Sequence, residues 1–317
     1  NEQEGSTRLN GNDLYYYIME EYNVPELEPL IVSTAMNNDL FYYDEKSKDL
    51  SIMSTYQGEC KVADFVKDKI ANSTQLDIDW TQYTTIDDFT MSEKQGKALE
   101  MFCKYNFMIL AGYSGSGKTT SIRGIIKLME SNGMTYTLLA PTGKASRRIT
   151  ESVNRQASTI HRKALRDGEI STDVLIVDEM SMTDLPTFLM MLNVIENPNI
   201  RVVLVGDPAQ LMPVGIGCVF NDLINSGKVP MITLDEIFRY DTDGGIFVAT
   251  NVRQGKQFFD NDIVKVHNNE YSVYNNYKFV QTDNIFDTIV EQYNKLLSKG
   301  VKPHDILCLS PFNVGDE

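Results

Sequence analysis

The feature that most constrains the fold is a series of five short, continuous apolar runs. They read NFMILAGY (106–113), TYTLLAP (135–141), DVLIVDE (173–179), IRVVLVGD (200–207) and PMITL (230–234). Strands of a parallel sheet are covered on both faces, so they carry apolar residues without polar alternation. A helical pattern separates the first two runs, with Ile122, Ile125, Ile126 and Met129 on one face and Gly133 as a helix-ending residue. Alternating strands and helices predict a doubly wound α/β sheet.

The chain divides by pattern into three parts. Residues 1–85 predict a small helical, winged-helix-like unit with a linker: helices over 13–22 and 27–39, a hairpin over 40–53, a helix over 56–70 and a polar linker over 71–88. Residues 86–256 carry the strand and helix alternation, and residues 257–317 add a strand over 277–282, a helix over 284–300 and a strand over 305–311. The small unit either binds DNA or packs on its neighbour, and its acidic residues favour packing.

The stretch AGYSGSGKTT, residues 111–120, joins the first apolar run to the following helix. Its spacing G-x-x-x-x-G-K-T is typical of a loop whose glycines turn backbone N–H groups toward phosphate oxygens at a helix N-terminus. We expect Lys118 to contact the β- and γ-phosphates of ATP and Thr119 to ligate Mg²⁺. The other expected contacts to ATP in this stretch are Gly112, Ser114, Gly115, Ser116, Gly117 and Thr120.

Polar residues follow two other apolar runs. Asp178 follows a run of four apolar residues, and Glu179 is next. Asp178 fits the carboxylate that holds the metal's water shell, and Glu179 fits the base that orients the attacking water. Gln210, which follows Gly206 and Asp207, is expected to sense the γ-phosphate. Because the carboxyl ends of parallel strands meet at one edge of a sheet, these side chains are expected beside the phosphate loop.

Composition limits the kinds of partner. With 29 Lys and Arg against 44 Asp and Glu, the net charge of −15 argues against a broad nucleic-acid surface, so any such site is a local groove. No apolar run approaches the roughly 20 residues of a membrane helix, and no signal peptide precedes the acidic start. The four scattered cysteines predict neither a zinc site nor a disulfide framework. A cytoplasmic protein without a membrane partner is expected.

The motifs together resemble a family. Gln95 in FTMSEKQ, the phosphate loop, APTGKASRRI, STIH, DEMS, GDPAQLMPV and EIFRY occur in the order of superfamily 1 DNA helicases, and most resemble the RecD-like, 5′-to-3′ branch. The resemblance covers about residues 89–240. It implies a RecA-like P-loop ATPase domain over 86–256, the beginning of a second RecA-like domain over 257–317, and ATP in the cleft between them. The small unit also resembles the domain that precedes the motor in this branch.

The same resemblance implies roles for further residues. Gln95 would contact adenine, and Arg239 would reach the γ-phosphate and act in catalysis. Single-stranded DNA would cross the tops of the two domains and contact Pro141, Thr142, Gly143, Lys144, Thr159 and His161. For His161 a purely local hydrogen-bonding role is equally open, and Arg147 and Arg148 fit either the strand or a solvated helix face.

The implied activity is an ATP-dependent 5′-to-3′ DNA helicase or translocase that works as a monomeric motor, with replication, recombination or repair proteins as possible partners. Two departures from the family pattern stand out. Only RKALRDGEIST (162–172) fills the place of a strand-separating pin, and no second-domain arginine motif follows LCLSPFNVGDE (307–317). We therefore expect this chain alone to be incomplete for hydrolysis. A nucleotide-gated DNA-binding or loader subunit and an RNA helicase remain alternatives, although Glu179 argues against a pure switch.

Overall fold

A computed structural model of the protein describes residues 6–11, 13, 16, 39–113, 115–235, 244–257, 259, 264–267, 270–274 and 276–309. The chain forms two compact units, Asn1–Phe238 and Arg239–Glu317. The predicted boundary at residue 85 lies inside the first unit, and the three-part division stays a prediction. The predicted helices over 13–22 and 27–39 lie almost wholly outside the described residues.

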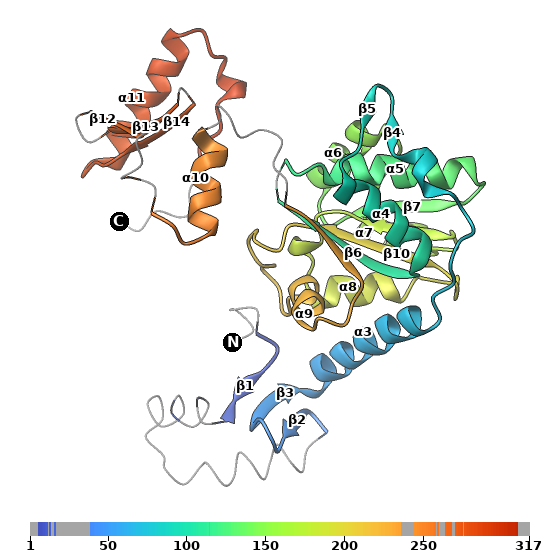
Figure 1. Ribbon diagram of the computed structural model, residues 1–317. Coiled ribbons are helices and arrows are strands. Elements are labelled where there is room, and N and C mark those ends of the chain that lie inside the picture. Colours follow the sequence, from blue (N-terminus) through green and yellow to red (C-terminus); the bar gives the residue numbers. More distant parts are fainter. Residues whose placement is uncertain are drawn as a thin grey trace. The chain divides into compact units, whose positions relative to one another are not determined.

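The first unit is built on a six-stranded sheet in which every pairing is parallel (Figure 1). Its order is β11-β6-β10-β9-β7-β8, with bounds β6 Phe107–Gly112, β7 Tyr136–Ala140, β8 Ser158–Thr159, β9 Val174–Val177, β10 Arg201–Gly206 and β11 Met231–Leu234. All five predicted strands are confirmed. The sixth, β8, was missed because two residues are too short to show a period. The predicted α/β fold class is thereby confirmed.

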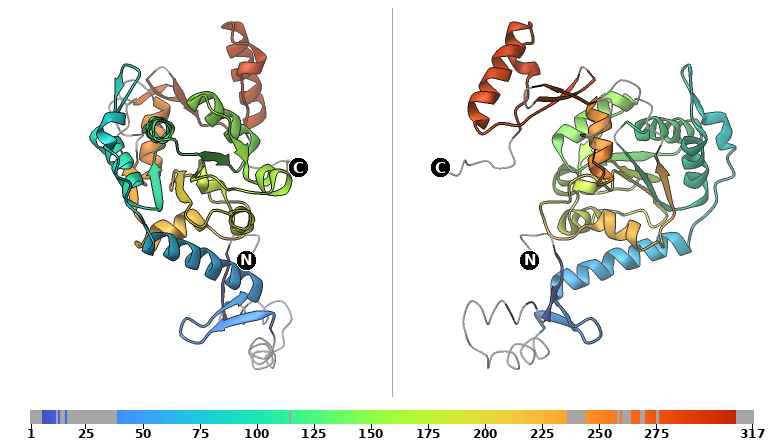
Figure 2. Two further views of the ribbon diagram at one scale, coloured as in Figure 1. Left: turned by 90° about the vertical axis from the view of Figure 1, so that its right-hand side faces the viewer. Right: turned by 60° about the vertical axis from the view of Figure 1, so that its left-hand side comes forward.

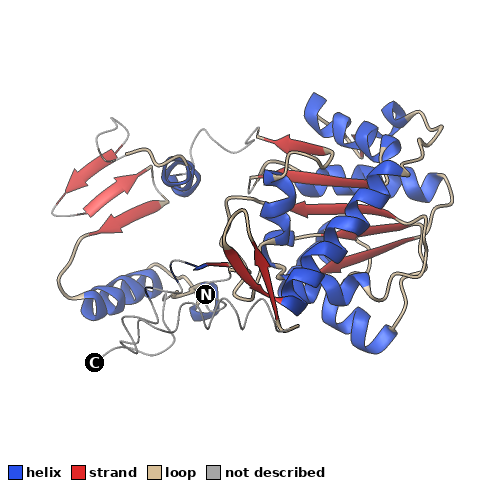
Figure 3. Ribbon diagram, turned by 90° about the horizontal axis from the view of Figure 1, so that it is seen from below, coloured by secondary structure: helices blue, strands red, loops and turns tan. Residues whose placement is uncertain are grey.

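Helices cover both faces of this sheet, whose strands lie side by side in Figure 3. Met108 and Leu110 of β6 pack on one face, whereas Phe107 and Ile109 pack on the other. The first face is covered by α4 (Glu93–Lys104), α5 (Lys118–Ser131) and α6 (Gly143–Val153), and the second by α3 (Met53–Ala71), α7 (Ile160–Arg162), α8 (Leu185–Leu192) and α9 (Val219–Asn225). This burial on both faces is why the strands are apolar without alternation.

The long helix α5 begins and ends where its glycines predict. Gly117, at the N-cap, has φ of 86°, in the left-handed region that glycine adopts without a steric penalty. After the C-terminal end of α5, Gly133 has φ of 68°. Its N–H donates to the carbonyl oxygen of Glu130, and the N–H of Met134 donates to that of Met129. These bonds satisfy carbonyl groups that the last turn of the helix leaves free, as the sequence predicted.

A small antiparallel sheet precedes α3. It contains β1 (Leu9–Asn10), β3 (Asp49–Ile52) and β2 (Phe41–Asp44) in that order, so the predicted hairpin and the helix after it are confirmed. Figure 2 shows α3 running from this sheet along the larger one. Val62 and Val66 of α3 are buried in the core of the second face, and the ring of Phe65 meets that of Phe107 edge-on at 6.4 Å. These contacts support the packing interpretation for α3.

The segment predicted as a polar linker packs on the sheet domain instead. Ile86 is buried in the core of the first face, and Leu76, Ile78, Trp80 and Tyr83 are partly buried against it. The segment forms a short helix over Trp80–Tyr83 and a hairpin of β4 (Thr85–Ile86) and β5 (Phe89–Thr90). The segment was predicted to be a linker because most of its residues are polar, although these few apolar side chains attach it to the core.

The second unit contains α10 (Gly244–Arg253), β12 (Val264–His267), β13 (Glu270–Val273), β14 (Tyr277–Val280) and α11 (Ile285–Ser298). The predicted strand over 277–282 and helix over 284–300 form as β14 and α11. The strand predicted over 305–311 does not form in its described residues, 305–309. The three strands pair antiparallel, which the strand, helix, strand pattern did not predict. The reason is that β14 pairs with β13, which precedes it directly in the chain.

The structure also describes the helices that could be tested for membrane spanning and the state of the cysteines. None of the described helices has both the length and the apolar character needed to span a bilayer. In the structure Cys60, Cys103, Cys218 and Cys308 are not joined in disulfides.

Candidate nucleotide and nucleic-acid sites

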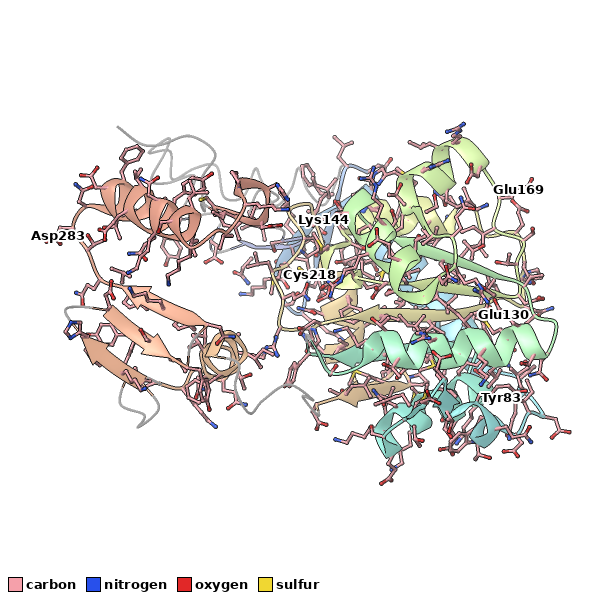
Figure 4. All side chains as sticks on the ribbon, turned by 90° about the horizontal axis from the view of Figure 1, so that it is seen from above. Tyr83, Glu130, Lys144, Glu169, Cys218 and Asp283 are labelled. Carbon is pink, nitrogen blue, oxygen red and sulfur yellow. The ribbon has the colours of Figure 1, made fainter. Side chains whose placement is uncertain are left out.

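The residues with predicted roles in ATP chemistry follow the carboxyl ends of adjacent strands. In the sheet β10 lies between β6 and β9, with Gly206 opposite Ala111 and Leu204 opposite Val177. The phosphate loop, the pair Asp178 and Glu179, and the loop of Asp207 to Gln210 therefore share one edge of the sheet. Figure 4 shows Lys144 and Cys218 toward this end of the strands, and Glu130 and Glu169 toward the other.

The phosphate loop is shaped by glycines that cannot be replaced freely. A Cβ on Gly112 would lie 2.6 Å from the Oγ of Ser116 and 3.0 Å from the Cβ of Leu234. Gly115 has φ of 80°, in the left-handed region. The Nζ of Lys118 donates to the carbonyl oxygens of Gly112 at 2.6 Å and Tyr113 at 3.1 Å. The lysine thus lies across the loop, where phosphate oxygens can take over its hydrogen bonds. Ser114 lies outside the described residues.

Acidic groups surround Lys118. Burial lowers the pKa of Lys118, and the charges of Asp207, Glu179 and Asp178 oppose that shift. Burial, followed by the charge of Glu179, raises the pKa of Asp178 to about 6. Asp207 is fully buried, and its Oδ1 accepts a hydrogen bond from the N–H of Ala209. Three carboxyl groups near one lysine leave this edge rich in negative charge, which suits a divalent cation.

The donor set fits Mg²⁺ held mainly by substrate and water. The described residues hold no group of three or more His, Cys, Asp or Glu side chains placed to bind one metal ion. Mg²⁺ in nucleotide sites keeps several waters and takes one or two protein oxygens together with phosphate oxygens. Asp178 and the hydroxyl of Thr119, at the start of α5, are the protein groups that would hold it.

Asp178→Asn is expected to stabilise the nucleotide-free protein at pH 8 by up to about 3 kcal/mol. The folded protein holds the Asp178 proton up to about pH 6, against 3.8 for the ordinary carboxyl, so it binds more protons than the unfolded chain in that window. The stability contributed by this group is therefore lost as pH rises through about 6. Asparagine removes the loss, and the gain should vanish only below the ordinary carboxyl value of 3.8, so urea unfolding at pH 8 and at about pH 3 compares the two cases.

Asp173→Asn is the matched control. Hydrogen bonds from the Thr135 side chain and backbone hold the pKa of Asp173 below its ordinary value, so this carboxylate stabilises the fold above that value. Asparagine at 173 is therefore expected to destabilise the protein at pH 8. Equal effects of the two substitutions at pH 8 would contradict the assignment of a buried, destabilised carboxylate to Asp178.

The two carboxylate oxygens of Glu179 have different surroundings. Its backbone lies in the left-handed region, with φ of 54°, which is uncommon for a residue with a side chain. The Oε1 atom accepts from Nη1 of Arg148 at 3.4 Å, while the buried Oε2 has no hydrogen-bond partner among the described residues. Buried polar atoms normally form hydrogen bonds, so we expect Oε2 to bind a group that is not part of the described protein. A water molecule poised for attack is such a partner.

Gln95 and Gln210 are two further residues of the predicted ATP site that the structure describes. Gln95 is 1% exposed, and its side chain is engaged on both sides: Oε1 accepts from the N–H of Ser92, and Nε2 donates to the carbonyl oxygen of Gly117. The structure thus gives Gln95 a supporting contact with the phosphate loop that the sequence did not predict. Gln210 lies half-buried, with its N–H bonded to the carbonyl oxygen of Asp207. The adenine contact stays a prediction, and Arg239 lies outside the described residues.

The predicted strand contacts lie along α6 and the short α7. Thr142 and Thr159 cap these helices: the Thr142 hydroxyl accepts from the N–H of Ala145 and that of Thr159 from the N–H of Arg162. Pro141 is half-buried, whereas Gly143, Lys144 and His161 are exposed. A cleft of about 300 Å³ between the two helices is lined by Gly143, Ser146, Arg147, Thr150, Glu151, Ala157, Ser158, Thr159 and Arg162. The structure thus brings both predicted segments to one hollow.

Basic side chains line this region more densely than predicted. Arg162, which the sequence reasoning missed, faces the cleft together with Arg147. A second hollow, of about 640 Å³, is lined by Gly143, Lys144, Arg147, Arg148 and Glu151. A local basic groove on an acidic protein is what the net charge required of any nucleic-acid site. The signal for Arg162 was its place one residue after the T-I-H motif.

No hairpin occupies the place of a strand-separating pin. Residues 160–172, all of them described, form α7 and then a single wide helical turn over Lys163–Asp167. Leu165 of this turn is 75% exposed. The short gap noted in the sequence therefore holds a helical turn in place of a pin.

The chain is similar in sequence to a family of AAA domains and to several curated helicases. A model of the AAA domain family matches residues 90–270. The chain is 35% identical over 170 residues to the ATP-dependent RecD2 DNA helicase of Deinococcus radiodurans, covering 51% of this chain and 23% of that protein. It is 28% identical over 209 residues to the RecBCD enzyme subunit RecD of Haemophilus influenzae, covering 53% and 32%. The chain thus spans a third or less of the length of these two curated relatives.

Other similarities are of the same kind. The chain is 30% identical over 200 residues to the ATP-dependent DNA helicase dda of Enterobacteria phage T4, covering 56% of this chain and 45% of that one. Among solved structures it is similar to Bacteroides Pif1 bound to ssDNA, with a TM-score of 0.39, 22% identity and coverage of 66% of this chain and 57% of that one. The curated relatives confirm the resemblance to RecD-like helicases that the motif order predicted. Since the matching family model spans more than half of its 317 residues, this chain belongs to the AAA domain family.

Proposed function

We propose that the protein is an ATP-dependent 5′-to-3′ DNA helicase or translocase, with residues 86–256 as its first motor domain. The observation that carries the proposal is the shared sheet edge: Lys118, Asp178 and Glu179 lie there with a basic groove beside them on α6 and α7. An ATP site next to a strand site is what a motor needs to convert hydrolysis into movement. The names of the RecD2 and dda relatives, both ATP-dependent DNA helicases, support the same conclusion.

In the proposed reaction each residue has a distinct task. Lys118 and the loop N–H groups bind the β- and γ-phosphates, and bound Mg²⁺ would neutralise charge on the transferring group. Asp178 would hold the water shell of the metal, and Glu179 is proposed to orient the attacking water and accept its proton. The water oxygen bonds to the γ-phosphorus while the bond to the ADP oxygen breaks. Gln210 and Arg239 are proposed to sense the γ-phosphate, and Gln95 to contact the adenine.

The strand is proposed to bind through its backbone. The hydroxyl groups of Thr142 and Thr159 and the charges of Lys144, Arg147 and Arg162 suit phosphates and sugars, not base edges. Contacts of this kind allow a motor to move along any sequence. Closure and reopening of two RecA-like domains, the second begun by residues 257–317, would advance the protein along the strand. We further propose a monomeric motor that works in the cytoplasm with replication, recombination or repair proteins.

The full-length protein is expected to unwind duplexes with a 5′ single-stranded tail and to leave 3′-tailed duplexes intact. Strand displacement with labelled oligomers measures this directly. The matched control is Lys118→Ala, which should abolish both ATP binding and unwinding with little change in the melting temperature of the nucleotide-free protein, because the hydrogen bonds of Lys118 to described residues go to loop carbonyls. Unwinding of 3′-tailed duplexes alone would overturn the direction. A fall in the melting temperature of the alanine variant would overturn the placement of Lys118.

A further inference from the structure

One ion pair joins the ATP edge to the basic groove. Arg148 of α6 donates from Nη1 to Oε1 of Glu179, across 31 positions of the chain. The same arginine lines the 640 Å³ hollow with Lys144 and Arg147. Its positive charge also acts on Lys118 and Asp178. Arg148 therefore contacts the proposed catalytic base and also lines the basic groove.

The pair is of a kind that is easily broken. The Arg148 side chain is 77% exposed, and the two atoms lie 3.4 Å apart, long for a charge-assisted hydrogen bond. Exposed ion pairs contribute little because water screens them and long side chains lose freedom. A nucleic-acid phosphate in the groove offers the guanidinium two oxygens in a matching fork geometry, which is a stronger bond. A strand in the groove should therefore take Arg148 away from Glu179.

Glu179 is the partner that would change state. Its side chain is only 17% exposed, and its Oε2 is already buried and without a partner among the described residues. With Arg148 on Oε1, that oxygen is occupied and the side chain is tied to α6, so Oε2 alone is left to contact a water. Without Arg148, both oxygens are free to align that water.

We propose that Arg148 is a positioning residue that restrains Glu179 until a single strand fills the groove, so that strand binding releases the base for hydrolysis. The proposal rests on the proposed function and adds its regulation. When the arginine moves to a strand phosphate, Glu179 accepts the proton of the water that attacks the γ-phosphorus, and ADP leaves with the electron pair of the broken bond. The restraint lowers hydrolysis in the absence of DNA, and it does not alter ATP binding.

The test is the ATPase rate of the full-length protein without DNA and with saturating single-stranded DNA. Arg148→Ala is expected to raise the DNA-free kcat about two- to fivefold, the range that an exposed pair allows. The DNA-saturated kcat and the KM for ATP should stay unchanged, so the stimulation ratio falls. Arg148→Lys, which keeps the charge, should restore most of the ratio. A purely structural arginine would give neither the selective rise nor the rescue.

Arg155→Ala is the matched control. Arg155 forms its ion pair with Glu130, which lies toward the other end of the strands (Figure 4), and its loss should leave the DNA-free rate unchanged. A DNA-free rate of Arg148→Ala at or below that of the wild type, with stimulation preserved, would overturn the inference alone. A wild-type ATPase that DNA does not stimulate would overturn the proposed function and the inference with it.

Discussion

Glu179→Gln is expected to lower kcat for ATP by about 100-fold or more, the usual contribution of a positioned general base, while ATP binding is retained. The amide keeps the size of the side chain and its acceptor for Arg148, but it cannot take a proton from water. The buried Oε2, which has no hydrogen-bond partner in the described part of the chain, is the atom we expect that water to contact. Steady-state ATPase of the full-length protein and equilibrium binding of a fluorescent ATP analogue measure the two effects separately.

The control for this substitution is Glu169→Gln. Glu169 is exposed and lies toward the opposite end of the strands from the phosphate loop (Figure 4). The same chemical change there should leave turnover intact. If Glu179→Gln hydrolysed ATP at a rate close to that of Glu169→Gln, the base would have to be another group at this edge, and the assignment would be wrong.

Arg201→Met is expected to destabilise the first unit by about 3 kcal/mol, because it orphans buried carbonyl groups at about 1–3 kcal/mol each. Arg201 begins β10 and is 3% exposed. Its Nη1 donates to the carbonyl oxygens of Phe102 at 2.9 Å and Tyr105 at 2.6 Å, and its Nη2 donates to that of Thr74. Burial lowers the pKa of Arg201 to about 10, which leaves it charged at neutral pH. The carbonyl groups therefore solvate a buried cation.

A fall in melting temperature of roughly 10 °C corresponds to this loss for a unit of this size. Arg123→Met is the matched control, since Arg123 is half-exposed and pairs with exposed Asp87 at 2.7 Å. Its loss should cost less than about 1 kcal/mol. Thermal unfolding monitored by circular dichroism compares the two. Equal melting temperatures would show that the Arg201 contacts do not stabilise the unit.

The sheet could be predicted from the sequence because burial on both faces leaves a direct record in composition. Every residue of β6, β9 and β10 is buried, and each strand was visible as an apolar run. The segment over 71–88 was wrongly predicted to be a linker because it contains no continuous apolar run. It packs through isolated apolar side chains such as Trp80, whose spacing follows no strand or helix period. In the second unit, pairing of β14 with β13 depends on a partner that its own residues do not reveal.

The candidate site shows the same limit. Glycine spacing and acidic residues at strand ends indicated Lys118, Asp178 and Glu179, because local chemistry constrains them. Contacts between distant residues left no such signal: the bond of Gln95 to Gly117, the pair of Arg148 with Glu179 and the burial of Arg201 each depend on the folded arrangement. The residues around an arginine at the start of an apolar run do not show whether its side chain is buried or exposed.

We propose a coupling, through one sheet edge, between ATP hydrolysis and a nucleic-acid strand. Its most direct test is the ATP hydrolysis rate of the full-length protein at saturating ATP and Mg²⁺, with and without a single-stranded DNA oligomer, and with an RNA oligomer of the same sequence. DNA is expected to raise the rate by about tenfold, equivalent to about 1.4 kcal/mol of barrier, and RNA is expected to raise it less. A rate that is the same with DNA and without it would contradict this coupling.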